Sequence, residues 1–100
     1  MIVVAGYLRF SPETLDSLRP LARETVEMTR AEAGCIVYAF SEDMAEPGLL
    51  RIYEEWQSAA HLDAHGQTPH IAAWRAALAE VEIIDRELKR VAVDGFSPFA

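Results

Sequence analysis

Three short apolar runs and one mixed run along the chain predict four β-strands. Met1–Phe10 and Cys35–Phe40 are apolar at both alternating positions, which is typical of strands covered on both faces. Leu49–Trp56 follows as a third strand, and the polar segment Ser41–Gly48 joins it to the second as a hairpin. Glu82–Val93 is the fourth predicted strand and carries the most charge.

The segment between the first two strands has a helical pattern. Ser11 is placed as an N-cap and Pro12 as the first helical residue. Gly34 is expected to end the helix, because a helix end often needs the left-handed backbone that glycine adopts. The positions that recur at helical spacing are Leu15, Leu18, Ala22, Val26 and Thr29.

A second helical region lies between the third and fourth strands. Ser58 caps a short helix that runs through His65, and Gly66 closes it. Thr68-Pro69 repeats the combination of cap and proline and opens another helical stretch. Its apolar face consists of Ile71, Trp74 and Leu78.

The element order strand, helix, strand, strand, helix, strand predicts an α+β fold of the ferredoxin-like type, with a four-stranded antiparallel sheet. Both helices of that fold cover the same face of the sheet. The first two strands are apolar on both faces, and a soluble monomer rarely leaves so large an apolar face in water. We therefore expect a homodimer in which two identical sheets pack face to face.

Composition narrows the class of protein. The 100 residues predict one domain, 1–100, and the net charge of −7 with a single lysine argues against a nucleic-acid partner. No apolar run is long enough to span a membrane and no export signal is visible, so we expect a cytoplasmic protein. The lone Cys35 excludes an intrachain disulfide.

Two motifs carry a resemblance to a known family. The first is Glu32-Ala33-Gly34-Cys35, followed by Tyr38, Asp43 and Glu46-Pro47-Gly48. The second is Tyr53-Glu54-Glu55-Trp56, followed by Ser58, His61-Leu62, His65 and Thr68-Pro69-His70. In order and spacing they resemble the "E-x-G-C … Y … D … P" hairpin and the "Y-E-x-W … H … S-P-H" segment of antibiotic biosynthesis monooxygenase (ABM) domains.

The resemblance implies a dimeric α+β barrel and several possible activities. Some members of the family oxidise polycyclic phenols or quinols with molecular oxygen and without metal, flavin or haem. Others are isomerases of small phosphorylated ketones, haem-degrading enzymes or proteins of unassigned activity. The family therefore fixes the fold better than the reaction.

The three histidines are the candidate catalytic residues. His61 and His65 are four apart and share a helical face, and His70 opens the next helical stretch. A histidine near a cavity can take the proton of a phenol, because its pKa lies near neutrality. The alternative is that His65 and His70 only bridge the break around Gly66. A metal site made of His61, His65 and Glu54 is a weaker alternative, and no metal is predicted.

Aromatic residues are the candidate substrate-binding groups for a flat molecule. They are Tyr7, Tyr53, Trp56 and Trp74, with Tyr38 and Phe40 as further contributors. The alternative for most of them is core or dimer interface. Tyr53 and Trp56 are three apart on a strand and so face opposite sides. Arg51 could hold a phenolate, or could form an ion pair with a neighbouring acid.

No cofactor is expected. Haem-degrading relatives use an asparagine in the first strand, and this chain contains none; they also use a helical histidine near the position of Trp74. The sequence contains no glycine-rich loop of the kind that binds the phosphates of a nucleotide. The sequence favours a cofactor-independent monooxygenase that oxidises a quinol or another electron-rich aromatic. The alternatives are a non-catalytic dimeric module that binds a small ligand, and an isomerase of a small ketone, which the scarcity of candidate arginines disfavours.

Overall fold

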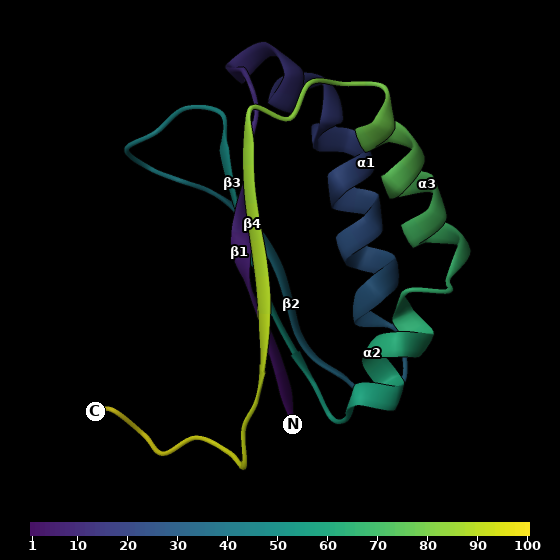
Figure 1. The fold of residues 1–100 in the computed structure, drawn as a ribbon, viewed down its shortest axis with the longest axis vertical. Helices are drawn as coiled ribbons and strands as arrows, with labels where there is room; N and C mark the ends of the chain where they lie inside the picture. Colours follow the sequence, from purple (N-terminus) through teal and green to yellow (C-terminus); the bar gives the residue numbers. More distant parts are fainter.

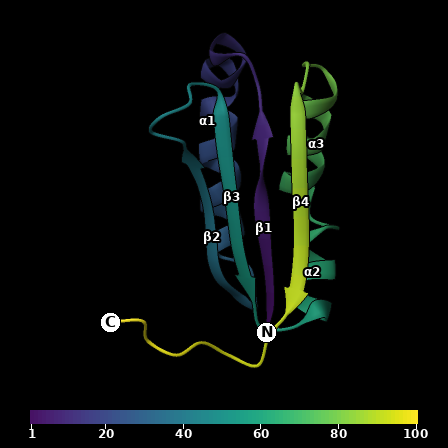
Figure 2. The same cartoon turned by 60° about the vertical axis from the view of Figure 1, so that its left-hand side comes forward.

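A computed structural model describes residues 1–100 and shows one four-stranded antiparallel sheet with its helices on one face (Figure 1). The strand order is β2-β3-β1-β4, so β2 and β4 are the edges (Figure 2). The predicted ferredoxin-like fold is confirmed, with the second helical region divided in two. In chain order the elements are β1 (Ile2–Arg9), α1 (Pro12–Arg30), β2 (Cys35–Glu42), β3 (Leu49–Trp56), α2 (Ala59–His65), α3 (Pro69–Ala79) and β4 (Asp85–Ala92).

Each helix begins where the sequence predicts a cap. The hydroxyl of Ser11 accepts a hydrogen bond from the backbone N–H of Thr14 at 3.1 Å. The hydroxyls of Ser58 and Thr68 accept in the same way from residues three further along the chain. These side chains satisfy N–H groups that the first helical turn leaves without a partner. The three predicted helix starts are therefore confirmed.

The end of α1 differs from the prediction. The helix stops at Arg30, and its cap Ala31 has right-handed backbone angles (φ −87°, ψ −7°). Gly34 does adopt a left-handed conformation (φ +81°), but it does so in the turn that leads into β2. A Cβ atom at Gly34 would also collide with the imidazole ring of His61. The glycine is required by the turn and by this close approach, and not by the helix end.

The edge strands also differ in length from their predictions. β2 continues past Phe40 to Glu42, because Ser41 and Glu42 remain paired with Arg51 and Leu50 of β3. β4 is shorter than expected and begins at Asp85. The ends of these edge strands are set by backbone pairing with the neighbouring strand, and not by the polarity of the residues there.

The core lies between the sheet and the helices. Leu8, Phe10 and Leu50 of the sheet side pack with Leu15 and Leu18 of α1, and each is at most 5% exposed. A smaller cluster of Val26, Tyr38 and Trp56 lies at the other end of α1. No helix is both long enough and apolar enough to cross a membrane.

The face of the sheet turned away from the helices is mixed. Along β1 and β2 it carries small apolar residues such as Val3, Ala5 and Ala39. Along β3 and β4 it carries charged residues such as Arg51 and Lys89. The predicted apolar character on both faces thus belongs to β1 and β2. The homodimer that would cover this face remains a prediction.

Candidate active site

A cavity of about 470 Å³ lies between the helix-facing side of the sheet and helices α2 and α3. Val4, Leu8 and Ile52 contribute to its sheet side, and Phe40 and Trp74 supply aromatic surface. Ten of its fourteen lining residues are hydrophobic, so the few polar groups that reach it must fix the orientation of a ligand. These polar groups are Glu54, His65, Arg75 and Arg86.

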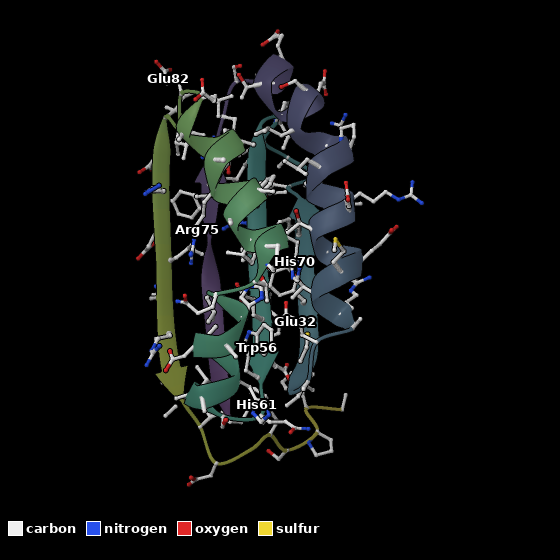
Figure 3. The ribbon with its side chains drawn as sticks, turned by 90° about the vertical axis from the view of Figure 1, so that its right-hand side faces the viewer. Glu32, Trp56, His61, His70, Arg75 and Glu82 are labelled. Atoms are coloured by element: carbon white, nitrogen blue, oxygen red, sulfur yellow. The ribbon has the colours of Figure 1, made fainter.

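His65 is held in the cavity wall by a carboxylate that belongs to the first family motif but is not among the predicted site residues. Glu32 lies in the turn after α1, and its Oε2 atom is 2.8 Å from Nδ1 of His65 and 2.7 Å from Nε2 of His70. The three side chains are 8% to 14% exposed. Figure 3 shows Glu32 and His70 side by side between α1 and the start of α3. Two of the three predicted histidines are therefore brought together, around an acid from a different part of the chain.

This arrangement sets the proton positions on His65. An ionised carboxylate can only accept hydrogen bonds, so Nδ1 of His65 donates to Glu32 and carries the proton. In a neutral imidazole the lone pair is then on Nε2, which makes no hydrogen bond within the protein. The rings of Trp56 and Tyr38 pack against His65 at centroid distances of 4.8 and 5.2 Å and fix its orientation. His65 thus has the geometry of a general base oriented by a carboxylate.

Glu54 is a second ionisable group in the cavity. Its side chain projects from β3, two residues before the end of the strand, and the residue is 7% exposed. Oε1 accepts a hydrogen bond of 2.9 Å from the indole nitrogen of Trp56. Burial raises the pKa of Glu54 above its ordinary value, because the charged form loses its hydration. The cavity therefore presents a base, His65, and a carboxyl group biased towards its protonated form.

His61, the third predicted histidine, lies apart from this cluster. Its Nδ1 atom is 2.8 Å from the hydroxyl of Ser58, and its ring packs against Gly34. It does not line the cavity. The spacing of four residues places His61 and His65 one turn apart on α2, but the His61 ring contacts Ser58 and Gly34 and does not reach the cavity.

The predicted substrate-binding residues are divided between the two faces of the sheet. Trp74 lines the cavity, and Trp56 is fully buried behind His65. Tyr7, Tyr53 and Arg51 lie on the face turned away from the helices, opposite to the side occupied by Leu8, Ile52 and Glu54. Their polar groups bond to acids there: Tyr7 to Asp85, Tyr53 to Glu55 and Arg51 to Asp43. The structure does not bring these three residues to the cavity.

The Glu32–His65–His70 cluster is also the set of side chains best placed to hold a metal ion. One ligand atom from each residue lies within 4.8 Å of the others. Two imidazole nitrogens and one carboxylate oxygen are donors that suit Zn²⁺ or another divalent transition metal. The donor set considered from the sequence, with His61 and Glu54, is not assembled. In the structure both imidazoles are hydrogen-bonded to the Glu32 carboxylate.

Comparison with known proteins adds a family to this geometry. A family model described as "Antibiotic biosynthesis monooxygenase" matches residues 1–77. "Putative monooxygenase Rv0793" of Mycobacterium tuberculosis is 36% identical over 80 residues, and the match covers 78% of each chain. A Deinococcus radiodurans structure described as "a putative antibiotic biosynthesis monooxygenase" superimposes with a TM-score of 0.91 at 27% identity, over 100% of this chain and 99% of that one.

Two further relatives match over a smaller part of their length. "Uncharacterized protein sll1783" of Synechocystis is 39% identical over 69 residues, which are 69% of this chain and 47% of that relative. "Probable quinol monooxygenase YgiN" of Escherichia coli is 40% identical over 55 residues, which are 47% of this chain and 53% of YgiN. The matches to these two proteins thus span about half of their length.

Proposed function

Since the chain belongs to the antibiotic biosynthesis monooxygenase family, we propose that it is a monooxygenase that oxidises a quinol or a related electron-rich aromatic with molecular oxygen and without a cofactor. The observation that carries this proposal is His65 in the wall of the cavity, with Nδ1 bonded to Glu32 and Nε2 free. A free imidazole nitrogen beside aromatic side chains suits the deprotonation of a phenol. The name of YgiN supports the quinol as a substrate class.

The reaction uses electrons from the substrate. His65 removes a phenolic proton, and the resulting phenolate is electron-rich enough to pass an electron to oxygen. The two radicals combine as a hydroperoxide on a ring carbon, and loss of water leaves a hydroxyquinone. A quinol and O₂ thus give a hydroxyquinone and one H₂O, and each product receives one of the two atoms of O₂. Glu54, in its protonated form, can donate a hydrogen bond to the oxygen that leaves as water.

The surrounding residues supply orientation and a dry environment. The cavity is wide enough for a small ring system, and Phe40 and Trp74 offer surfaces on which a flat ring can stack. Apolar walls keep the phenolate away from bulk water, so that positioned groups act on it more strongly than in solution. All of these residues belong to one chain, so the proposed reaction does not depend on the dimer.

Oxygen uptake by purified, EDTA-treated protein tests the proposal. We expect uptake above the spontaneous rate with at least one member of a panel of hydroquinones and naphthohydroquinones. Replacing the base, His65→Gln, should lower the rate by about a hundredfold or more, the usual contribution of a general base. His61→Gln is the matched control, because His61 is on the same helix and outside the cavity.

Three outcomes would contradict the proposal. The first is no uptake above the spontaneous rate over the whole panel, which would favour a non-catalytic ligand-binding module. The second is an equal loss of rate in His65→Gln and His61→Gln. The third is activity that EDTA abolishes and Zn²⁺ or Fe²⁺ restores, which would assign the Glu32–His65–His70 cluster to a metal.

We also propose that the protein is a homodimer that buries the mixed face of its sheet. The apolar side chains of β1 and β2 on that face support this, because residues such as Ala5 and Ala39 are only partly buried within one chain. Light scattering at micromolar concentration should give twice the chain mass of 11.1 kDa. A monomer at that concentration would contradict the proposed dimer and leave the cavity unaffected.

A further inference from the structure

Some of the positively charged side chains have an acidic partner and others do not. Five of the nine Lys and Arg residues form ion pairs on the surface. The four without an acidic partner are Arg30, Arg75, Arg86 and Arg90. Arg30 donates to the carbonyl of Tyr38, away from the cavity. In a chain with a net charge of −7, the remaining three arginines without an acid therefore need an explanation.

Two of these three arginines line the cavity from opposite sides. Arg75 projects from α3 and lies on the side of that helix towards β4 in Figure 3. Arg86 is on β4, next to Leu8 of β1 and on the same face of the sheet. Arg90 follows on that face of β4, opposite Val4. Only one of these guanidinium groups has a hydrogen bond within the protein, from Arg75 to the carbonyl of Gly66 at 3.0 Å.

Arg75 and Arg86 lie where the cavity opens to solvent. Leu88 lines the cavity between Arg86 and Arg90, yet it is 52% exposed, and every residue of β4 is exposed. At the closed end, Glu54 and His65 are buried. The cavity thus has an apolar interior with the reactive groups at one end and unpaired guanidinium groups at the other.

We propose that Arg75 and Arg86 form an anion-binding rim, so that the substrate is an aromatic molecule that carries a carboxylate or phosphate group. Guanidinium groups bind both anions through charge and paired N–H donors. The ring fills the apolar interior with its hydroxyl towards His65, and the anionic group stays at the mouth between α3 and β4. The oxidation of the aromatic ring rests on the proposed function. The anionic group of the substrate is inferred from the arginines that lack an acidic partner.

Binding of unreactive probes tests the anion separately from any turnover. The probes are 2-naphthoate, 2-naphthyl phosphate and the neutral 2-naphthylmethanol, which share one ring system. Their affinity is measured by titration calorimetry and by quenching of tryptophan fluorescence, since Trp74 lines the cavity. We expect at least one anion to bind about tenfold more tightly than the alcohol, the combined effect of two exposed charge contacts. Comparison of the two anions identifies the preferred group.

Charge-removing variants locate the effect. Arg75→Gln and Arg86→Gln should each weaken binding of the preferred anion about three- to fivefold, and leave the alcohol unchanged. Lys89→Gln is the matched control: it removes one positive charge from the same strand, but its side chain is on the opposite face and is paired with Glu87. Raising the salt concentration should weaken binding of the anion alone.

Equal affinity for the anions and the alcohol would overturn this inference. So would an equal loss of anion binding in Lys89→Gln, because the effect would then reflect net charge and not the rim. The failure of the proposed function looks different: anions bind through Arg75 and Arg86, but no quinol with or without an anionic group consumes oxygen.

Discussion

The two halves of the helical layer cover the same sheet in different ways. Under α1, Leu15 and Leu18 pack against Phe10 and Leu50, and each of these residues is at most 5% exposed. Under α2 and α3, the sheet faces a cavity of about 470 Å³ in which Glu54 and His65 are buried. The α1 half therefore stabilises the fold by burying apolar side chains. The α2 and α3 half buries less apolar surface and holds polar groups beside the cavity.

The comparison shows that the polar half is organised by long-range contacts. Glu32 follows α1, whereas His65 ends α2 and His70 begins α3, so one carboxylate joins three segments. Breaks in the helical layer create this meeting point, because a continuous helix from Ala59 to Ala79 could not present His65 and His70 to the same oxygen atom.

The largest expected effect is a difference in stability loss between substitutions in the α1 half and in the cavity half. Phe10→Ala removes a side chain that is 1% exposed in the filled half and should lower the free energy of unfolding by about 3–5 kcal/mol. Leu88→Ala in the open half should cost less than about 1 kcal/mol, because Leu88 is already half exposed. Urea denaturation of both variants measures the difference. Similar losses would mean that the cavity half is packed as tightly as the α1 half.

The next effect separates the halves by activity. Glu32→Gln keeps the shape of the side chain but removes the charge that orients His65, and should lower turnover about ten- to a hundredfold, as loss of an orienting partner typically does. Glu27→Gln, on the exposed surface of α1, is the control and should leave turnover unchanged. An unchanged rate in Glu32→Gln would remove the carboxylate from the mechanism.

A smaller effect concerns the pH dependence of stability. Burial raises the pKa of Glu54 in the folded protein above 4.5, so ionisation of Glu54 opposes folding as the pH rises through that region. Glu54→Gln keeps an acceptor for Trp56 and cannot ionise. The variant should therefore match the wild type in Tm near pH 4 and exceed it at pH 7 to 8. A difference in Tm that is constant with pH would contradict the raised pKa.

The smallest effect tests the face turned away from the helices. Tyr53→Phe removes the hydroxyl that bonds to Glu55 at 2.7 Å on the exposed side of β3. We expect no change in oxygen uptake and less than about 0.5 kcal/mol in stability, as for most surface substitutions. A clear loss of turnover would show that this face takes part in the reaction, and would return Tyr53, Tyr7 and Arg51 to the substrate-binding residues.

Most of the fold could be predicted from the sequence, because local patterns determined it. Three apolar runs and one mixed run located the four strands, and Ser11, Ser58 and Thr68 act as the helix caps that their residue types predict. The prediction that Gly34 ends α1 was wrong, because Gly34 is required by the turn into β2 and by the close approach of His61, which no local pattern encodes.

The site depended on tertiary structure. The sequence determined that His65 and His70 flank a helix break, and the motif that contains Glu32 marked the turn before β2, but neither pattern joins the two segments. Only the folded chain brings the Glu32 carboxylate to both imidazoles and leaves Arg75 and Arg86 without acidic partners at the mouth of the cavity. The physical reason is range: caps and periodicity act within a few residues, whereas hydrogen bonds between side chains 33 and 38 residues apart form only after the helices have packed on the sheet.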